Sequence, residues 1–239
     1  MVELELQDGL AVITIDRPHA RNAVDLATMA ELEKALDAAD GALALAVTGA
    51  GEKAFVSGGD LKELARLRTE PEASAMALRM RAVCDRIAAF PGPVVAALNG
   101  HALGGGAEVA VAADIRIAAD DVRIGFNQSR LAIVPAWGGA ERLARLVGPG
   151  RALLLAGTGR VLDAAEAERL GLVDVVLPRA GFADAWREFA RGLATAQARE
   201  IKNLTTRTRT PEEAAAAFAR LWVAEEHWEA AERVMSRGR

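Results

Sequence analysis

The sequence has 239 residues, of which 51% are hydrophobic and 26% are charged, and its net charge is −4. These values predict a folded globular chain of one domain, or one domain with a small appendage, and exclude an intrinsically disordered protein. Without an excess of basic residues, the sequence does not favour nucleic acid as a partner. No run of about 18 apolar residues is present, so we expect no membrane partner either.

Two features bear on the cellular location. The first residues, MVELELQDGL, lack the basic region and the apolar segment of a secretory signal. Cys84 is the only cysteine, which excludes an internal disulfide, and we interpret it as a small buried hydrophobic side chain. Both features predict a cytoplasmic protein, although a mature chain stripped of a targeting peptide would give the same pattern.

Strand and helix patterns alternate through the first half of the chain. Period-two alternation and continuous apolar runs predict strands at 2–6, 10–15, 42–51 and 92–100. Apolar residues at helical spacing predict helices over 25–39 and from about 60 to 89. A further helix is expected to begin inside the glycine triplet Gly104–Gly106.

The alternation continues to about residue 178 and then gives way to helical patterns alone. Strands are predicted at 114–118 and 122–126, helices at 138–148 and 150–158, and a helix, turn and strand over 162–178. The final helical segment, 211–235, starts at Pro211 and has one face lined by Phe218, Leu221, Trp222 and Trp228. We therefore predict an α/β core domain over 1–180 and a helical C-terminal region over 181–239.

The glycine triplet is a candidate anion site. It follows a predicted strand and precedes a predicted helix, whose N-terminal N–H groups favour negative charge. The phosphate-binding patterns G-x-x-x-x-G-K-[ST] and G-x-G-x-x-G are absent, so a developing oxyanion remains as the functional interpretation. The alternative is close packing of a helix on a strand without any ligand. Glu108 favours function, because it precedes the apolar run 109–113 and is a candidate catalytic carboxylate.

A second glycine loop, Ser57-Gly58-Gly59, follows another predicted strand and leads into a helix near Asp60. Asp60 has an alternative role as the N-cap of that helix. Two such loops are able to supply two backbone N–H groups to one oxygen atom, which is the geometry of an oxyanion hole.

Four stretches in this order resemble the crotonase family, also called the enoyl-CoA hydratase/isomerase family. They are DRPHARNAV (16–24), GEKAFVSGGDLKEL (51–64), NGHALGGGAEVAVAADIRIA (99–118) and VPAWGGAERLARLVG (134–148). The resemblance implies an α/β fold, a spiral of ββα units with a helical C-terminal region that serves trimerisation and the acyl pocket. It further implies a homotrimer or dimer of trimers, an acyl-CoA thioester as substrate, no metal, and no cofactor beyond the coenzyme A of the substrate.

The resemblance also assigns roles to individual residues. The oxyanion hole falls on the backbone N–H groups of Gly59 and Gly105, and the first acid–base residue falls on Glu108. The substrate-binding positions fall on Arg21, Ala23, Ala54, Ser57, Gly58, Asp60, Leu61, Leu103, Gly104, Pro135 and Trp137. Asn22 is expected to hold its own loop together, whereas His19 and His101 match no catalytic position of the family.

One position departs from the family pattern. Hydratases of this family use a second glutamate, and its place before the P-x-x-G-G motif falls on Gln128, which is able to orient a molecule but not to carry a proton at neutral pH. A register shift of two residues would place Arg130 there instead. The stretch VPAWGG is similar to the ethylmalonyl-CoA decarboxylase-like branch. By this resemblance Trp137 would narrow the acyl pocket, and an ordinary core tryptophan is the alternative.

Several functions therefore stay open. The first is an enoyl-CoA hydratase or isomerase that uses Glu108 as its acid–base residue. A decarboxylase or isomerase that needs one carboxylate, and a catalytically silent protein that binds coenzyme A thioesters, are the alternatives. An oxidoreductase that binds a dinucleotide through the glycines is the least supported.

Overall fold

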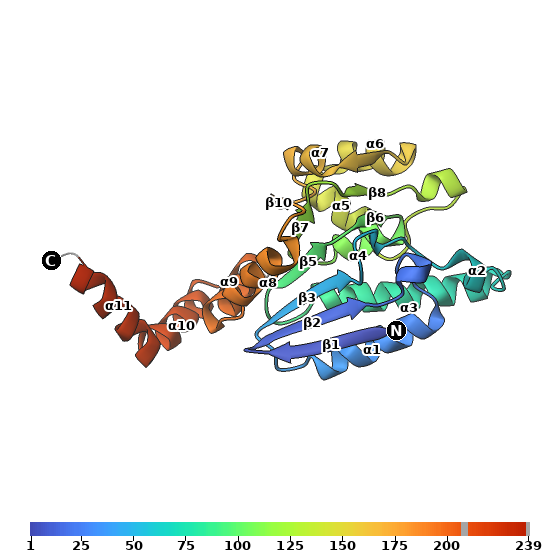
Figure 1. The fold of residues 1–239 in the computed structure, drawn as a ribbon. Coiled ribbons are helices and arrows are strands. Elements are labelled where there is room, and N and C mark those ends of the chain that lie inside the picture. The colour runs from blue at the N-terminus through green and yellow to red at the C-terminus, as the bar shows by residue number, and fades with distance from the viewer. Residues whose placement is uncertain (207–209, 238–239) are drawn as a thin grey trace.

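The structure is a computed structural model, and it describes residues 1–206 and 210–237 (Figure 1). The strands are β1 (Val2–Gln7), β2 (Leu10–Ile15), β3 (Ala44–Gly49), β4 (Ala54–Val56), β5 (Val94–Leu98), β6 (His101–Leu103), β7 (Ile115–Ala119), β8 (Arg123–Gly125), β9 (Val161–Asp163) and β10 (Val175–Leu177). The α-helices are α1 (Leu26–Ala38), α2 (Leu61–Leu64), α3 (Glu70–Ala88), α4 (Gly105–Ala110), α5 (Gly139–Val147), α6 (Pro149–Thr158), α7 (Ala164–Arg169), α8 (Phe182–Gly192), α9 (Ala196–Thr206), α10 (Pro211–Trp222) and α11 (Glu225–Arg237). Two short 3-10 helices are η1 (Pro18–Ala20) and η2 (Gln128–Leu131).

Within the described residues, the strands form two sheets. The larger has the order β1-β2-β3-β5-β7-β10, in which β1 is antiparallel to β2 and the other neighbours are parallel. Every residue of β3 and β5 is buried, as their continuous apolar sequences predict for central parallel strands. The smaller sheet has the order β4-β6-β8-β9.

Successive pairs of strands divide between these sheets. β3, β5 and β7 enter the large sheet, and the strand that follows each of them, β4, β6 or β8, enters the small one. A helical segment comes after each pair, namely α2 and α3, then α4, then η2 and α5. This repeat is the predicted spiral of ββα units, and it brings the loops after β4, β6 and β8 to neighbouring positions.

The predicted helix over 60–89 is wrong as a single element. The structure divides it into α2 and α3, because Thr69 is the N-cap of a second helix. The Thr69 side chain accepts from the N–H of Glu72, and the Glu72 carboxylate accepts from the N–H of Thr69. Such a capping box, with Pro71 in the first turn, ends any helix that arrives from before it.

The predicted single helix over 211–235 is also divided. α10 begins at Pro211, as expected, but ends at Trp222, and α11 starts at Glu225. Trp222 stacks against His227 across the break, with 4.5 Å between ring centroids, and meets Trp228 edge-on at 5.4 Å. The aromatic side chains therefore gather around a bend instead of lining one straight face.

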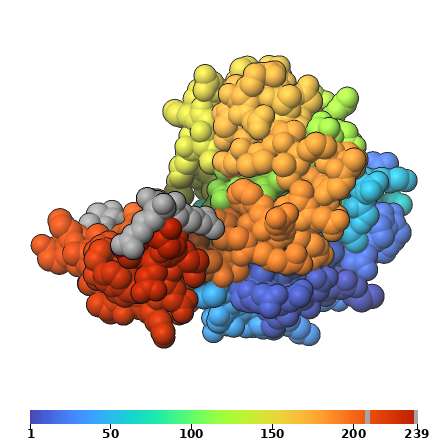
Figure 2. Space-filling view, turned by 60° about the vertical axis from the view of Figure 1, so that its left-hand side comes forward, coloured from blue at the N-terminus to red at the C-terminus, as the bar shows by residue number. Residues whose placement is uncertain are grey.

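The C-terminal helices stand away from the body of the molecule (Figure 1). α8 still belongs to the core, because Phe182, Trp186 and Ala190 are buried in it. From α9 onward the chain leaves the sheets, and α10 and α11 project as an arm beside the body (Figure 2). The domain boundary at residue 180 stays a prediction. No helix in the described ranges is long and apolar enough to cross a membrane.

Candidate active site

Glu108 lies inside the protein, on the first turns of α4. All six residues of this helix are buried, and Glu108 is 2% exposed. Its Oε2 accepts from the backbone N–H of Trp137 at 2.7 Å and of Gly139 at 2.9 Å. Its Oε1 accepts from Nε2 of Gln128 at 2.9 Å. The apolar sequence after Glu108 requires α4 to be buried, and this requirement takes the carboxylate inward.

The environment of Glu108 shifts its protonation equilibrium toward the neutral form. Burial raises the pKa of this carboxyl from its ordinary value of 4.5, while the donors from Gly139, Trp137 and Gln128 act in the opposite direction. Burial wins because taking a charge out of water costs more than a few hydrogen bonds return. A carboxyl with a raised pKa, held at the wall of a cavity, is suited to take up and release a proton.

Gln128 faces Glu108 from η2, and the residue two places on, Arg130, is exposed. Gln128 is 5% exposed, and while its Nε2 donates to Glu108, its Oε1 is buried without a hydrogen-bond partner in the described residues. Turning the amide over would set two acceptor oxygens against each other while Glu108 is ionised. The side chain therefore presents an unused acceptor beside the carboxylate.

The two glycine loops meet next to this pair. A Cβ added to Gly58, whose φ is +106°, would lie 3.3 Å from the backbone nitrogen of Gly105. Val24 bonds to the residues on either side of Gly59, through Gly58 O and Asp60 N, so the N–H of Gly59 points away from that strand. Neither Gly59 N nor Gly105 N donates a hydrogen bond to another described residue. Two free N–H groups thus lie on adjoining loops.

The Trp137 ring covers these loops. A Cβ on Gly105 would lie 2.1 Å from Cζ3 of this ring, and a Cβ on Gly59 would lie 3.9 Å from its Cζ2. Gly105 is required because only a residue without a side chain leaves room for the indole.

Glu108, Gln128, Trp137 and the glycines all line one cavity of about 210 Å³. Its other lining residues are Ser57, Gly104, Asn127 and Ala136 and the apolar Leu61, Leu64, Met76, Ala77, Leu131, Ile133 and Val134. Among the described residues that line it, Glu108 is the only one with a titratable side chain. The cavity is therefore an apolar chamber with a single acid–base group.

A second hollow, of about 390 Å³, adjoins the first through Ser57, which lines both. Its lining contains the predicted residues Arg21, Ala54, Ser57 and Leu103, and adds Glu52, Lys53, His101, Asp121 and Arg179. Asn22 fixes the loop beside it, because its Nδ2 donates to the carbonyl oxygens of Ala50 and Ala54. Its Oδ1 accepts from the backbone N–H of Arg17 at 2.9 Å, so the prediction that Asn22 holds its own loop together is confirmed.

Three predicted substrate-binding residues lie outside both hollows. The Asp60 carboxylate caps α2 by accepting from two backbone N–H groups, and it pairs with Arg17 at 3.1 Å. Ala23 is buried and Pro135 is half-buried, and neither lines a hollow described above. The structure thus supports the N-cap alternative for Asp60.

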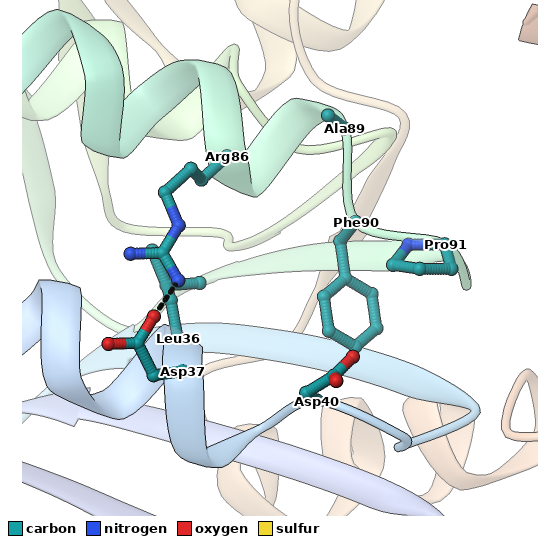
Figure 3. A pocket seen from close by; sticks show the side chains of 7 residues that line it. All are labelled: Leu36, Asp37, Asp40, Arg86, Ala89, Phe90 and Pro91. Atoms are coloured by element: carbon teal, nitrogen blue, oxygen red, sulfur yellow. Dashed lines mark hydrogen bonds and ion pairs between the residues drawn. The ribbon is translucent and has the colours of Figure 1, made fainter.

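A separate surface hollow of about 420 Å³ lies between the C-terminal ends of α1 and α3 (Figure 3). Arg86 and Asp37 form an ion pair there, beside the ring of Phe90. It shares no lining residue with the cavity around Glu108, so it takes no part in the candidate site. In the described ranges, no group of three or more His, Cys, Asp and Glu side chains is placed to hold a metal ion.

Comparison with known proteins agrees with this arrangement. The profile of the enoyl-CoA hydratase/isomerase family matches residues 5–231. The chain belongs to the enoyl-CoA hydratase/isomerase family. It is therefore an acyl-CoA-processing enzyme, as its sequence motifs led us to expect.

Individual relatives of this family resemble the chain over most of its length. A short-chain-enoyl-CoA hydratase from Clostridium acetobutylicum is 39% identical over 197 residues, which cover 81% of this chain and 75% of that protein. A crotonyl-CoA hydratase from Syntrophomonas wolfei is 42% identical over 177 residues, which cover 73% of this chain and 68% of that protein. The crystal structure of an enoyl-CoA hydratase from Bacillus anthracis has a TM-score of 0.88 at 31% identity, covering 99% of this chain and 96% of that one. The predicted crotonase-like fold is confirmed.

Two arginines near the candidate site were not singled out by the sequence analysis. Arg179 enters the second hollow from a loop before α8 and donates to the carbonyl oxygen of Asn99, 80 residues away in sequence. Arg142 contacts the backbone of Trp137, and no motif distinguishes it from its helical neighbours. Tertiary contacts bring Arg179 and Arg142 to these positions, and spacing along the chain does not reveal such contacts.

Proposed function

We propose that this enzyme adds water across the double bond of a 2-enoyl-CoA, with Glu108 as its one acid–base side chain. The observation that carries the proposal is the unpartnered Oε1 of Gln128, buried beside the Glu108 carboxylate in the same cavity. A water molecule that donates one hydrogen to Gln128 and the other to Glu108 satisfies the acceptor that the protein leaves open. The curated relatives named above are hydratases, which supports the same reaction.

In this proposal the thioester oxygen lies between the free N–H groups of Gly59 and Gly105. The oxygen of the water bonds to C3 of the enoyl group as Glu108 takes its proton, and the π electrons move to the thioester oxygen as an enolate. Each backbone donor to such an oxyanion is typically worth about 3–4 kcal/mol of barrier. When the carbonyl re-forms, C2 takes the proton from Glu108. The Glu108 carboxylate is then back in its starting state, and one water molecule has been added to the enoyl group.

A second candidate, either isomerisation or decarboxylation, is favoured by the lining of the cavity, in which Glu108 is the only titratable side chain among the described residues. One carboxylate suffices to move a proton along a 3-enoyl group, or to protonate the enolate that remains when a malonyl-type thioester loses CO₂. Both reactions use the same two N–H groups. A silent binder of acyl-CoA would use them without turnover.

A product assay by mass spectrometry separates these possibilities. The purified protein is incubated with crotonyl-CoA, a 3-enoyl-CoA and ethylmalonyl-CoA, alongside Glu108→Gln and the control Glu3→Gln, which changes an exposed glutamate on β1. We expect crotonyl-CoA to gain the mass of water, and Glu108→Gln to reduce this gain by about 10²- to 10⁴-fold. A shifted double bond or loss of CO₂, with crotonyl-CoA unchanged, would replace hydration by the second candidate. Thermal stabilisation by acyl-CoA without any product would identify a silent binder.

The wider setting belongs to the same proposal. The second hollow, with Arg21, Lys53 and Arg179 in its lining, fits the phosphates of coenzyme A as part of the substrate, and no separate cofactor is invoked. We place the reaction in fatty acid metabolism because the proposed substrate is an enoyl-CoA. We place it in the cytoplasm because Cys84 is a buried free thiol. The exposed aromatic side chains of the arm support assembly as a homotrimer or dimer of trimers.

A further inference from the structure

The turn from Trp137 to Gly139 controls two parts of the candidate site at once. Its N–H groups bind Oε2 of Glu108 from both ends of the turn. Its indole ring packs on Gly105, the proposed oxyanion donor. A displacement of this turn therefore moves the hydrogen bonds to the carboxylate and the wall of the cavity together.

Arg142, on α5, braces the turn from behind. Its Nη1 donates to the carbonyl oxygen of Trp137 at 3.1 Å, and its Nη2 forms an ion pair with Asp85 on α3. The side chain is 12% exposed, so this charge is largely withdrawn from water. A peptide group is planar, so fixing the Trp137 carbonyl fixes the plane of the Trp137–Gly138 peptide, which lies between the two peptides that carry the N–H donors. Through Arg142, the orientation of the N–H groups of Trp137 and Gly139 depends on the position of Asp85 and therefore of α3.

A second arginine supports the same arrangement. Arg81 Nε donates to the other oxygen of Asp85 at 3.3 Å, and Arg81 Nη1 donates to Glu141 at 2.7 Å. A Cβ added to Gly138 would lie 2.3 Å from Arg142 Nη1 and 3.0 Å from Arg81 Nε. Both guanidinium groups therefore pack directly on the backbone of the turn, where Gly138 has a φ of +87°.

We propose that Arg142 is a positioning residue, which keeps the N–H groups of the Trp137–Gly139 turn aimed at Glu108 and so sets the proton affinity of that carboxylate. The inference rests on the proposed role of Glu108 as the acid–base group. It adds to that role a device outside the cavity, since Arg142 lines no part of it.

The other neighbours of Glu108 do not titrate in the range where it works. Gln128, on η2, carries no charge. Burial raises the pKa of the Cys84 thiol, on α3, to about 12, so it stays neutral. The remaining donors are backbone N–H groups of the turn and of Ala136 before it. A change in the proton affinity of Glu108 on altering Arg142 therefore comes through the turn or from the charge of Arg142 itself. Asp85→Asn, which keeps that charge, separates the two, because it raises the pKa of Glu108 only if the turn transmits the effect.

The test measures Glu108 directly, by a ¹³C NMR titration of glutamate side-chain carboxyls in the full chain, with Glu108→Gln used to assign the signal. Arg142→Gln is expected to raise the pKa of Glu108, because the charged form loses well-aimed donors. Arg142→Lys is expected to recover part of the change, since an ammonium reaches either Trp137 O or Asp85 but does not span both as the fork does. Arg145→Gln, an exposed arginine of the same helix without a hydrogen bond to any described residue, is the matched control.

Kinetics with the substrate found in the product assay give the second measurement. We expect Arg142→Gln to lower kcat by about 10- to 100-fold with KM changed by less than about twofold, and to move the acid limb of kcat/KM to higher pH. Asp85→Asn, which releases Arg142 while keeping it in the chain, is expected to act in the same direction and serves if Arg142→Gln does not fold. An unchanged Glu108 titration in the Arg142 and Asp85 variants would overturn the inference. Full activity of Glu108→Gln would instead overturn the proposed function.

Discussion

At the scale of single residues, the site is built from groups that the fold leaves no freedom to move. Glu108 is held by donors from two elements, and Oε1 of Gln128 has no hydrogen-bond partner among the described residues. Gly105 is as constrained as the charged groups, because the indole of Trp137 occupies the space where its Cβ would be.

The first residue-scale prediction concerns Gly105→Ala. Its methyl group would lie 2.1 Å from the Trp137 ring, so the ring and its turn must shift, and we expect kcat to fall by about 10²-fold. The double variant Gly105→Ala/Trp137→Leu lacks the clash. We therefore expect Gly105→Ala to lower kcat less when it is added to Trp137→Leu than when it is made in the natural chain. Steady-state kinetics of the natural chain, the two single variants and the double variant give the coupling energy between Gly105 and Trp137. Gly150→Ala, at a glycine with open space around it, is the control, and an effect of Gly105→Ala no larger than this control would contradict the prediction.

The second residue-scale prediction concerns pH and stability. Burial raises the pKa of Glu108 in the folded protein above its value in the unfolded chain. Its contribution to stability is therefore fully present below about pH 4.5 and is lost as pH rises through the folded-state pKa. Glu108→Gln carries no charge at any pH, and its amide is able to donate to the free Oε1 of Gln128. We thus expect this variant to become more stable than the natural chain as pH rises from 4.5 to 8.

Urea unfolding at several pH values and one protein concentration checks this sign. A tenfold difference in proton affinity between folded and unfolded states corresponds to about 1.4 kcal/mol. Glu3→Gln, on the exposed edge strand β1, should show no such trend. A Glu108→Gln variant that loses stability relative to the natural chain as pH rises would show that the donors outweigh burial.

At the scale of elements, the long buried strands were easier to predict than helix boundaries, whereas the three-residue strands β4, β6 and β9 were not predicted. Continuous apolar runs identified β3 and β5 because a strand buried on both faces needs no polar residue. The break between α2 and α3 was missed, although the capping pair Thr69 and Glu72 and the proline between them mark it in the sequence. Local propensity alone favoured one long helix there.

Long-range pairing sets the limit of sequence reasoning for elements. Arg116 lies in β7 with 1% exposure, in a stretch whose pattern indicated an ordinary strand. Its partner is Asp174, 58 residues later, whose carboxylate accepts from the backbone N–H of Arg116 at 2.8 Å and pairs with its guanidinium. The sequence around Arg116 does not indicate this partner, because the parallel pairing of β7 and β10 brings Asp174 next to Arg116.

The candidate site shows the same division. Motif order placed Gly59, Gly105, Glu108 and Gln128, and the structure brings these four to one cavity. The side chains behind them, such as Arg142 and Asp85, belong to different elements and meet only through the packing of α3 against the start of α5. Residues on the loops after successive strands were therefore predictable, and residues that brace those loops were not.

At the scale of the whole molecule, the arm of α10 and α11 leaves large aromatic side chains exposed to water. It carries Phe218, Trp222 and Trp228, which are 62%, 44% and 46% exposed, and it projects from the body in both views (Figures 1 and 2). Burying a large apolar side chain is worth about 1.5–3 kcal/mol, so several aromatic residues left in water strongly favour association. Other copies of the same chain are always available at the concentration of the protein itself, so we expect them to cover these aromatic side chains.

The exposed aromatic side chains favour association, and the family resemblance implies a homotrimer or dimer of trimers. We therefore predict a mass of three or six chains in light-scattering measurements after gel filtration. Trp222→Glu places a charge in the centre of the aromatic cluster, where it contacts Phe218, His227 and Trp228, and is expected to shift the protein to single chains. The body should stay folded, because Trp222 belongs to the arm and lies outside the core cluster. Glu226→Gln, a polar change on the same arm, should leave the mass unaltered. A natural protein that elutes as single chains, or a Trp222→Glu variant of unchanged mass, would show that this cluster does not join the subunits.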